Sequence, residues 1–272
     1  MMMRFKLTIG LLTLLSLTVS AQSDSVVSSR ITTSSQMIGV GGSNILDTYL
    51  SQEKFRGVGI SFLSMVERRK SERRWSTVME HQAHFSYTHD RGRTAKELEG
   101  SYAFFWGKFY RWSLFHDRLQ LQAGGLLNVG VGFIYNTVNS NNPAQARVHL
   151  NIMPSAIATY HFPLFKRAAA LRYEINLPLV GNMFSPHYGQ SYYEIFNKGN
   201  YDHNIVPTTM VSEPYFRQLL TLDINVSQKT TLRIGYLGDY QQSNVNGLRT
   251  HIYSHRGMIG IVRSFKITHY RP

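Results

Sequence analysis

Apolar and polar residues alternate along most of the chain, which is the pattern of a β-strand with two different faces. The clearest segment is LQLQAGGLLNVGVGFIY, residues 119–135, in which only Leu126 and Ile134 break the alternation. Period two also runs through residues 28–40, 58–62, 79–87, 102–112, 148–162, 171–179, 220–226, 232–240 and 259–267. Several of these segments exceed the usual strand length of about five or six residues. The pattern predicts an all-β protein of about ten strands, with twelve as the alternative count.

The connections between these segments alternate in length. Those near ERRKSE, LFHD, LFKR and SQK are short, whereas those near SNILDTYLSQEK, DRGRTAKE, NTVNSNNPAQ, QQSNVNGL and residues 182–214 are longer. An even strand number with short turns at one end and longer loops at the other is typical of outer-membrane barrels. We therefore expect an antiparallel up-and-down transmembrane β-barrel with one long extracellular loop. A soluble β-sandwich or a lipocalin-like barrel, with its apolar face inside, is the alternative.

Aromatic residues stand at the ends of several apolar faces. Such residues would lie at the outer rim (Phe133, Tyr135, Tyr236, Tyr240) and at the inner rim (Tyr160, Phe162, Trp112). Two aromatic girdles of this kind mark the membrane interfaces of transmembrane barrels. The long strands and the expected girdles favour a membrane barrel over a soluble one.

The first 21 residues have the composition of a signal peptide. Arg4 and Lys6 precede the apolar stretch LTIGLLTLLSLTV, and Val19-Ser20-Ala21 has the spacing of a cleavage site. We expect residues 1–21 to be removed and residues 22–272 to form one barrel domain in the outer membrane of a Gram-negative cell. The chain has no cysteine, which excludes disulfides and thiol chemistry.

The formal net charge of +13 points to anionic partners. For an exported barrel these are outer-membrane lipids and lipopolysaccharide. The turn at residues 67–74, ERRKSERR, either meets phospholipid phosphates at the inner surface or is a plain solvated turn. No recognition-helix or RNP-like pattern accompanies the charge, so nucleic acid is not an expected partner.

If the apolar faces meet lipid, six charged or titratable side chains point into the lumen: Glu80, His84, Arg172, Glu174, Asp223 and Arg233. Pairing Val226 with Leu232 keeps the apolar faces of the hairpin at residues 220–240 together. It places Asp223 diagonal to Arg233, which predicts an ion pair of Arg233 with Asp223 or with a neighbouring carboxylate such as Glu174. These groups fill a narrow barrel or line a charged conduit, and the limited interior room favours filling.

No constellation in the sequence points to catalysis, so an enzyme is not the favoured interpretation. A membrane lipase needs a serine beside a histidine. Aligning apolar faces puts Val58 or Ile60 opposite His81, with Ser64 away near the periplasmic end. A rim protease could draw on loop residues (His187, Glu194, Asp202, His203), but any polar loop contains such types. His149 and His161 are too far apart to share a metal ion. We expect no metal and no cofactor.

Residues 182–214 interrupt the alternation with a long, tyrosine-rich segment. Loops of this length are uncommon unless they are functional or disordered, and aromatic residues are depleted in disordered segments. We expect an ordered loop folded over the barrel mouth, carried by Tyr188, Gln190, Tyr192, Tyr193, Glu194 and Phe196. Over residues 185–196 at least two of its four large aromatic rings should be buried.

Three stretches carry a resemblance to known proteins. GMIGIVRSFKI, followed by Tyr270, resembles the last strand through which the barrel-assembly machinery recognises outer-membrane barrels, although Arg271 and Pro272 follow the aromatic residue. FSPHYGQSYYEIF and NILDTYLSQEKFRG are similar to the bacterial family named domain of unknown function 3316. The resemblance implies an outer-membrane-type barrel and no assigned activity.

These observations lead to a porin-like expectation of function. The protein would pass or bind a small polar solute, with residues 182–214 restricting the barrel mouth. The alternatives are a membrane-embedded enzyme acting on lipid or lipopolysaccharide, and a closed structural or surface-binding barrel.

Overall fold

The computed structural model describes residues 28–227 and 230–269. Its elements are twelve strands and one short helix, in the order β1 (Ser28–Asp47), β2 (Ser51–Lys70), β3 (Trp75–His89), β4 (Lys96–Leu114), β5 (Leu119–Asn136), β6 (Ala144–Leu164), β7 (Arg167–Asn176), β8 (Val180–Phe184), α2 (Tyr192–Phe196), β9 (Ile205–Thr209), β10 (Tyr215–Asn225), β11 (Thr231–Val245) and β12 (Leu248–His269). The expected signal peptide and the residues after His269 lie outside the described residues.

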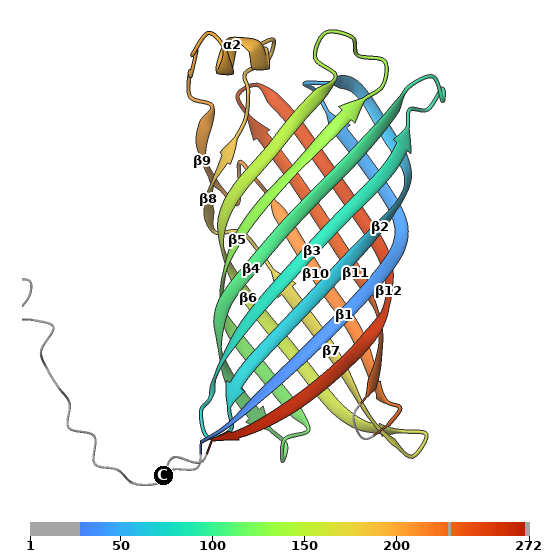
Figure 1. Cartoon of the computed structure of the whole chain (residues 1–272), viewed down its shortest axis with the longest axis vertical. Helices are drawn as coiled ribbons and strands as arrows, with labels where there is room; N and C mark the ends of the chain where they lie inside the picture. Colours follow the sequence, from blue (N-terminus) through green and yellow to red (C-terminus); the bar gives the residue numbers. More distant parts are fainter. Residues whose placement is uncertain (1–27, 228–229, 270–272) are drawn as a thin grey trace, which may run out of the picture.

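Ten of the strands close a tilted antiparallel barrel (Figure 1). Neighbouring strands pair in the order β5-β4-β3-β2-β1-β12-β11-β10-β7-β6, and pairing of β5 with β6 completes the circle. The predicted all-β transmembrane-type barrel of ten strands is therefore confirmed. Among the described residues, no helix combines the length and the hydropathy that crossing a membrane requires.

Strands β8 and β9 extend the wall at the upper end, where α2 lies in Figure 1. β8 continues along β6 from the point where β7 stops. β9 pairs with β8, whereas residues 212–214 pair with β11 through two backbone hydrogen bonds. The returning chain thus departs from the wall above β10, and β8 and β9 form a hairpin that carries the α2 segment.

The apolar faces of the strands point outward. Exposed apolar residues follow β1 to β5 at alternate positions, among them Ile38, Val58, Phe85, Trp106, Leu127 and Val131. At the lower end Trp75 and Trp112 both make edge-on contacts with Tyr110, and Tyr160 stacks on Phe162. An apolar outer wall with aromatic rings near one rim is the surface that a lipid bilayer requires.

The apolar residues that break the alternation point inward and pack against one another. Three interior clusters consist of Val78, Ala103, Phe105, Phe109, Leu126, Met153, Ile157 and Tyr215; of Met37, Leu63, Met65, Leu219, Leu237 and Met258; and of Ile45, Leu50, Phe55, Ala95, Ile134 and Ile252. Together they draw on opposite walls of the barrel, so side chains fill much of its interior.

Two of the loops expected to be long are tight turns. β1 and β2 are joined by residues 48–50, and β11 and β12 by residues 246 and 247. The strands continue because inward residues such as Ile45 and Ile252 remain buried, whereas their outward neighbours turn polar beyond the apolar band. A polar stretch above a membrane therefore looks like a loop in the sequence although it is a strand.

The expected burial of two rings in residues 185–196 is wrong. Tyr188, Tyr193 and Phe196 are 69%, 60% and 59% exposed, and Tyr192 is half-buried. The reason is that residues 192–196 form a helical turn, which directs Ile195 into the barrel rim and Tyr193 away from it. The segment is nevertheless tied to the rim, because the Tyr49 hydroxyl donates to the Gln190 carbonyl over 3.0 Å.

Candidate functional site

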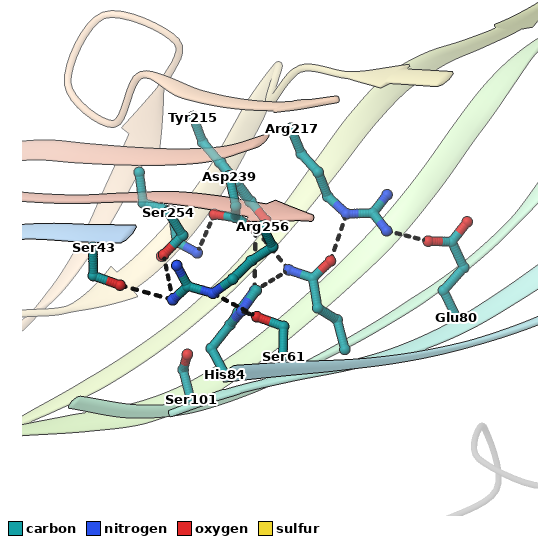
Figure 2. Close-up of polar contacts among 12 residues, drawn as sticks. Ser43, Ser61, Glu80, His84, Ser101, Tyr215, Arg217, Asp239, Ser254 and Arg256 are labelled. Atoms are coloured by element: carbon teal, nitrogen blue, oxygen red, sulfur yellow. Dashed lines mark hydrogen bonds and ion pairs between the residues drawn. The ribbon is translucent and has the colours of Figure 1, made fainter. Parts of the chain in front are cut away.

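A polar network crosses the barrel interior, and Arg217 of β10 is its centre. The Arg217 guanidinium donates to Glu80 over 2.5 Å and to Gln82 over 2.8 Å, both on β3, and to Glu174 of β7 over 3.0 Å. β3 and β10 are five strands apart in either direction around the barrel. Arg217 therefore spans the lumen, as Figure 2 shows for its contact with Glu80, and its side chain is 0% exposed.

The same arginine also rests on an apolar surface. Its guanidinium carbon lies 4.7 Å from the centre of the Phe105 ring, which belongs to one of the interior clusters. Glu174 is held in addition by Arg172, over 2.7 Å, and by the Asn176 amide, over 3.1 Å. These contacts pair the buried charges, which is the condition for keeping them in a packed interior.

A second part of the network lies between β3 and β11. The Gln82 amide nitrogen and the Tyr215 hydroxyl both donate to Asp239, over 2.6 and 3.1 Å. His84 Nε2 lies 3.7 Å from the same carboxylate. The Gln82 side chain therefore connects Asp239 with Arg217, which joins the two parts into one network.

Arg256 of β12 forms the third part, shown beside Asp239 in Figure 2. Its guanidinium donates to the Gly42 carbonyl and to four hydroxyls, those of Ser43, Ser61, Ser86 and Ser254. The Ser86 hydroxyl in turn donates to Glu99, over 2.9 Å, which also accepts from Ser101. The network thus links β12 with β1, β2, β3 and β4.

The structure places five of the six lumen residues expected from the sequence in the buried interior: Glu80, His84, Arg172, Glu174 and Arg233. Arg233 donates to both carboxylate oxygens of Asp223 over 2.6 Å, so the predicted ion pair is confirmed. This pair does not join the Arg217 network. It lines a cavity of about 180 Å³ at the lower end, together with Arg172 and Arg111.

Sequence reasoning missed the centres of the network, Arg217, Asp239 and Arg256. Arg217 lies on the same face of its strand as Thr221 and Asp223. Extending the alternation by four residues, from Thr221 back to Arg217, would have placed Arg217 inside the barrel. No signal in the sequence pairs it with Glu80, because residues 137 positions apart meet only when the barrel closes.

Three residues of the network resemble a hydrolase triad in composition. Ser61 Oγ lies 2.5 Å from His84 Nδ1, and His84 faces Asp239. However, Ser61 Oγ also accepts a hydrogen bond from Arg256, and the three residues are 5%, 8% and 1% exposed. A substrate cannot reach a serine that is packed in this way, so the arrangement is suited to holding the wall together.

The outer face near His81 differs from the expectation. The strand register pairs His81 with Ser64, not with Val58 or Ile60. Even so, His81 Nδ1 contacts the Tyr102 hydroxyl at 2.6 Å, and no hydrogen bond between Ser64 and His81 occurs in the described part of the chain. A serine nucleophile with its base is therefore not assembled here.

The side chains of the loop residues that could have served a rim protease contact their own segment. Asp202 and His203 pair over 2.6 Å, and His187 Nε2 contacts the Asp202 carbonyl at 2.7 Å. The His203 imidazole holds the pKa of the Asp202 carboxyl below its usual range. Among the described residues no group of three or more His, Asp or Glu is arranged to bind a metal ion.

Hydrogen bonds hold α2 in place on the rim. Ser191 caps its first turn by accepting from the Glu194 amide over 3.2 Å, and Glu194 accepts from the Ser191 amide over 2.8 Å. The Ala146 amide donates to the Tyr192 hydroxyl over 2.7 Å, and Gln190 accepts from Asn204 over 2.7 Å. Burial raises the pKa of the Tyr49 phenol to about 12, which keeps it a neutral donor to Gln190.

We expect α2 to loosen under acid conditions. The hydrogen bonds from Ser191 lower the pKa of the Glu194 carboxyl, so their contribution is complete above the ordinary glutamate pKa of about 4.3. That contribution is lost as the pH falls through the lowered pKa. Hydrogen exchange of the amides of residues 191–197, corrected for the intrinsic pH dependence, measures the effect. Glu194→Gln keeps an acceptor without a titrating charge, so an equal pH response in both proteins would contradict this assignment.

Comparisons with known proteins identify a family but no activity. The family described as "Protein of unknown function (DUF3316)" matches residues 7–272, and no curated protein matches. The solved structures that resemble the chain include outer membrane protease OmpT from Escherichia coli, at 10% identity and TM-score 0.45, covering 92% of this chain and 99% of that one. Neisserial surface protein A is 8% identical, with TM-score 0.37 and coverage of 87% and 97%. An outer membrane channel from Pseudomonas putida F1 is 9% identical, with TM-score 0.35 and coverage of 90% and 98%. The match over nearly the whole sequence means that this chain belongs to the DUF3316 family.

Proposed function

We propose that this protein is a closed barrel of the outer membrane that acts through its surface and does not conduct solutes. The observation that carries the proposal is the contact of Arg217 with Glu80 and Gln82 on the opposite wall. A bridge of paired charges across a ten-strand barrel leaves no room for a hydrated solute at that level. The apolar clusters add further side chains to the same interior.

The part of the surface best suited to binding is the α2 segment, residues 185–204. Its backbone is held by the Ser191 cap and by the Asn246 side chain, which donates to the Ser185 and His203 carbonyls. Its exposed rings include those of Tyr188, Tyr193 and Tyr201. Tyrosine provides a large contact area at a small cost in conformational entropy, and a preorganised segment loses less freedom on binding.

Passage of a small polar solute, the expectation from the sequence, is the second candidate. The lower cavity with Arg172, Asp223 and Arg233 favours it, because polar groups there could admit a small anion as far as the Arg217 bridge. Passage would then require the bridge to open.

Planar-bilayer conductance of the refolded protein separates the two candidates. We expect no stepwise openings at neutral pH, with a refolded porin measured in the same bilayers as positive control. Uptake of a small hydrophilic dye by cells that express the protein should likewise match that of cells without it. Stepwise conductance of the wild-type protein would overturn the closed barrel and would establish passage as its function.

A further inference from the structure

The outer wall carries a hollow of about 650 Å³ at the lower rim, away from the interior network. It spans β1 to β4 and is lined by six basic residues and by apolar and hydroxyl side chains: Arg30, Arg68, Arg69, Lys70, Arg73 and Lys108, with Trp75, Ser76, Thr77, Met79 and Trp106. A concentration of positive charge beside tryptophan rings on a membrane-facing wall requires a physical explanation.

The strand register arranges the basic side chains in two rows. Arg68 pairs with Thr77, and Thr77 with Lys108, so the first row runs across β2, β3 and β4. Arg30 pairs with Lys70 in the second row, across β1 and β2. Adjacent strands lie about 4.8 Å apart, which is the backbone separation of Arg30 and Lys70, whereas Arg68 and Lys108 are two strand spacings apart, with Thr77 between them. Their long side chains can converge on one phosphate group placed over Thr77.

The four cations of these two rows form no ion pair with a carboxylate within the described residues. Every ion pair found there involves other basic side chains. The neighbouring Glu67 accepts a hydrogen bond from Gln122 over 3.3 Å and lines the interior cavity, on the other face of the wall. Unneutralised positive charges of this density attract an anion.

The surface next to the rows, toward the middle of the barrel, is apolar. Val66, Met79 and Trp106 are paired in register across β2, β3 and β4, one step along the outer face from the first row. Trp75 lies on the other side, in edge-on contact with Tyr110. Cations at the rim followed by an apolar strip along the wall match a phosphate headgroup followed by acyl chains.

We propose that this hollow binds an anionic glycerophospholipid with two phosphates, of the diphosphatidylglycerol class. One phosphate lies between Arg68 and Lys108, the other beside Arg30 and Lys70, and an acyl chain follows Met79 and Trp106. A soluble anion would gain nothing from the apolar strip, and a zwitterionic lipid brings its own ammonium group to the same site. The proposal rests on the barrel spanning an outer membrane with its lower rim in the phospholipid leaflet, and is independent of whether the lumen conducts.

Native mass spectrometry of the refolded protein, extracted from vesicles of phosphatidylethanolamine and diphosphatidylglycerol, tests the site. We expect the wild-type protein to retain diphosphatidylglycerol preferentially. The double variant Arg68→Gln/Lys108→Gln should lower that preference on the order of thirtyfold, because each basic side chain near an anionic lipid contributes about fivefold. The control variant Lys54→Gln/Arg249→Gln removes two basic residues from the opposite rim. It should leave the preference for diphosphatidylglycerol unchanged.

Two further arms make each outcome decisive. Millimolar inorganic phosphate should not displace the lipid, and displacement would reduce the site to a general anion site. Lipopolysaccharide added to the vesicles should bind independently of Arg68 and Lys108. If its binding depended on these two residues, the lower rim would lie in the lipopolysaccharide leaflet and the proposal would be overturned. Equal lipid preference in wild-type and double-variant proteins that are both folded, as judged by heat-modifiable gel migration, would overturn the proposal. Conductance should not change in either variant. A negative result for the lipid site therefore does not affect the proposal that the barrel is closed.

Discussion

Replacing Arg217 with methionine is expected to lower the free energy of unfolding of the barrel by about 3–5 kcal/mol. Methionine keeps an apolar chain against Phe105 but leaves Glu80 and Glu174 without the cation that joins them. A stranded buried carboxylate costs more than the net worth of the ion pair, because it was desolvated during folding and has lost its compensation. Urea unfolding in lipid vesicles, followed by tryptophan fluorescence, measures the change.

The network offers both a rescue and a matched control for this experiment. Glu174 keeps its ion pair with Arg172, so Glu80 is the carboxylate left without a cation. Adding Glu80→Gln to the methionine variant removes that uncompensated charge and should restore most of the lost stability. Arg233→Met breaks an ion pair of similar geometry that lines the lower cavity, where water can solvate Asp223, so its cost should be clearly smaller. If Arg217→Met and Arg233→Met lowered the free energy of unfolding equally, the contacts of Arg217 across the lumen would contribute no more than an ion pair at the edge of the barrel.

Substituting alanine for Gly107 should destabilise the barrel by about 3 kcal/mol or more, since overpacking costs rise when the backbone itself must move. A Cβ atom on Gly107 would lie 1.9 Å from the carbonyl oxygen of Gly125 on the neighbouring strand. No rotamer change can relieve that contact, because both atoms belong to the wall. Heat-modifiable gel migration and urea unfolding should both report a loss of folded barrel.

Gly125→Ala is the control for this second prediction, because it lies on the same pair of strands. Its Cβ would point outward and meet only the Met153 carbonyl oxygen at 3.8 Å, an ordinary contact distance. We expect wild-type stability within about 0.5 kcal/mol, as for most surface substitutions. If the two alanine variants unfold at the same urea concentration, the close backbone approach between β4 and β5 does not make the stability of the barrel sensitive to a side chain at Gly107.

Both predictions concern the same property of a narrow barrel. Its interior is small and has little spare room, so stability depends on close backbone approach between neighbouring strands and on side chains that meet from opposite walls. Arg217 contacts β3, β4 and β7, and Arg256 contacts β1, β2 and β3. This arrangement explains why charged residues persist in an interior that three apolar clusters also occupy.

The sequence by itself determined the strand number and which residues face outward. A period of two needs no tertiary information, because successive side chains of a strand always point to opposite faces. The exceptions were visible too: Leu126 and Ile134 interrupt the pattern of residues 119–135, and both are buried in interior clusters. The ion pair of Arg233 with Asp223 was predicted from one hairpin, although the expected register was wrong by two residues and placed Asp223 diagonal to Arg233. The observed register pairs the two residues directly, and a shift of two residues leaves each side chain on its expected face.

Only the tertiary structure decided which inward residues meet. Arg217 contacts Glu80 because ten strands close into a circle, and closure is not encoded in any single strand. The same holds for the tight turns after β1 and β11, where outward residues are polar because water replaces lipid above the membrane band. It also holds for α2, whose capping residues Ser191 and Glu194 are visible in the sequence but whose exposed rings depend on how the rim supports the helix. Local patterns specify local geometry, whereas contacts across a lumen depend on the position of every strand between them.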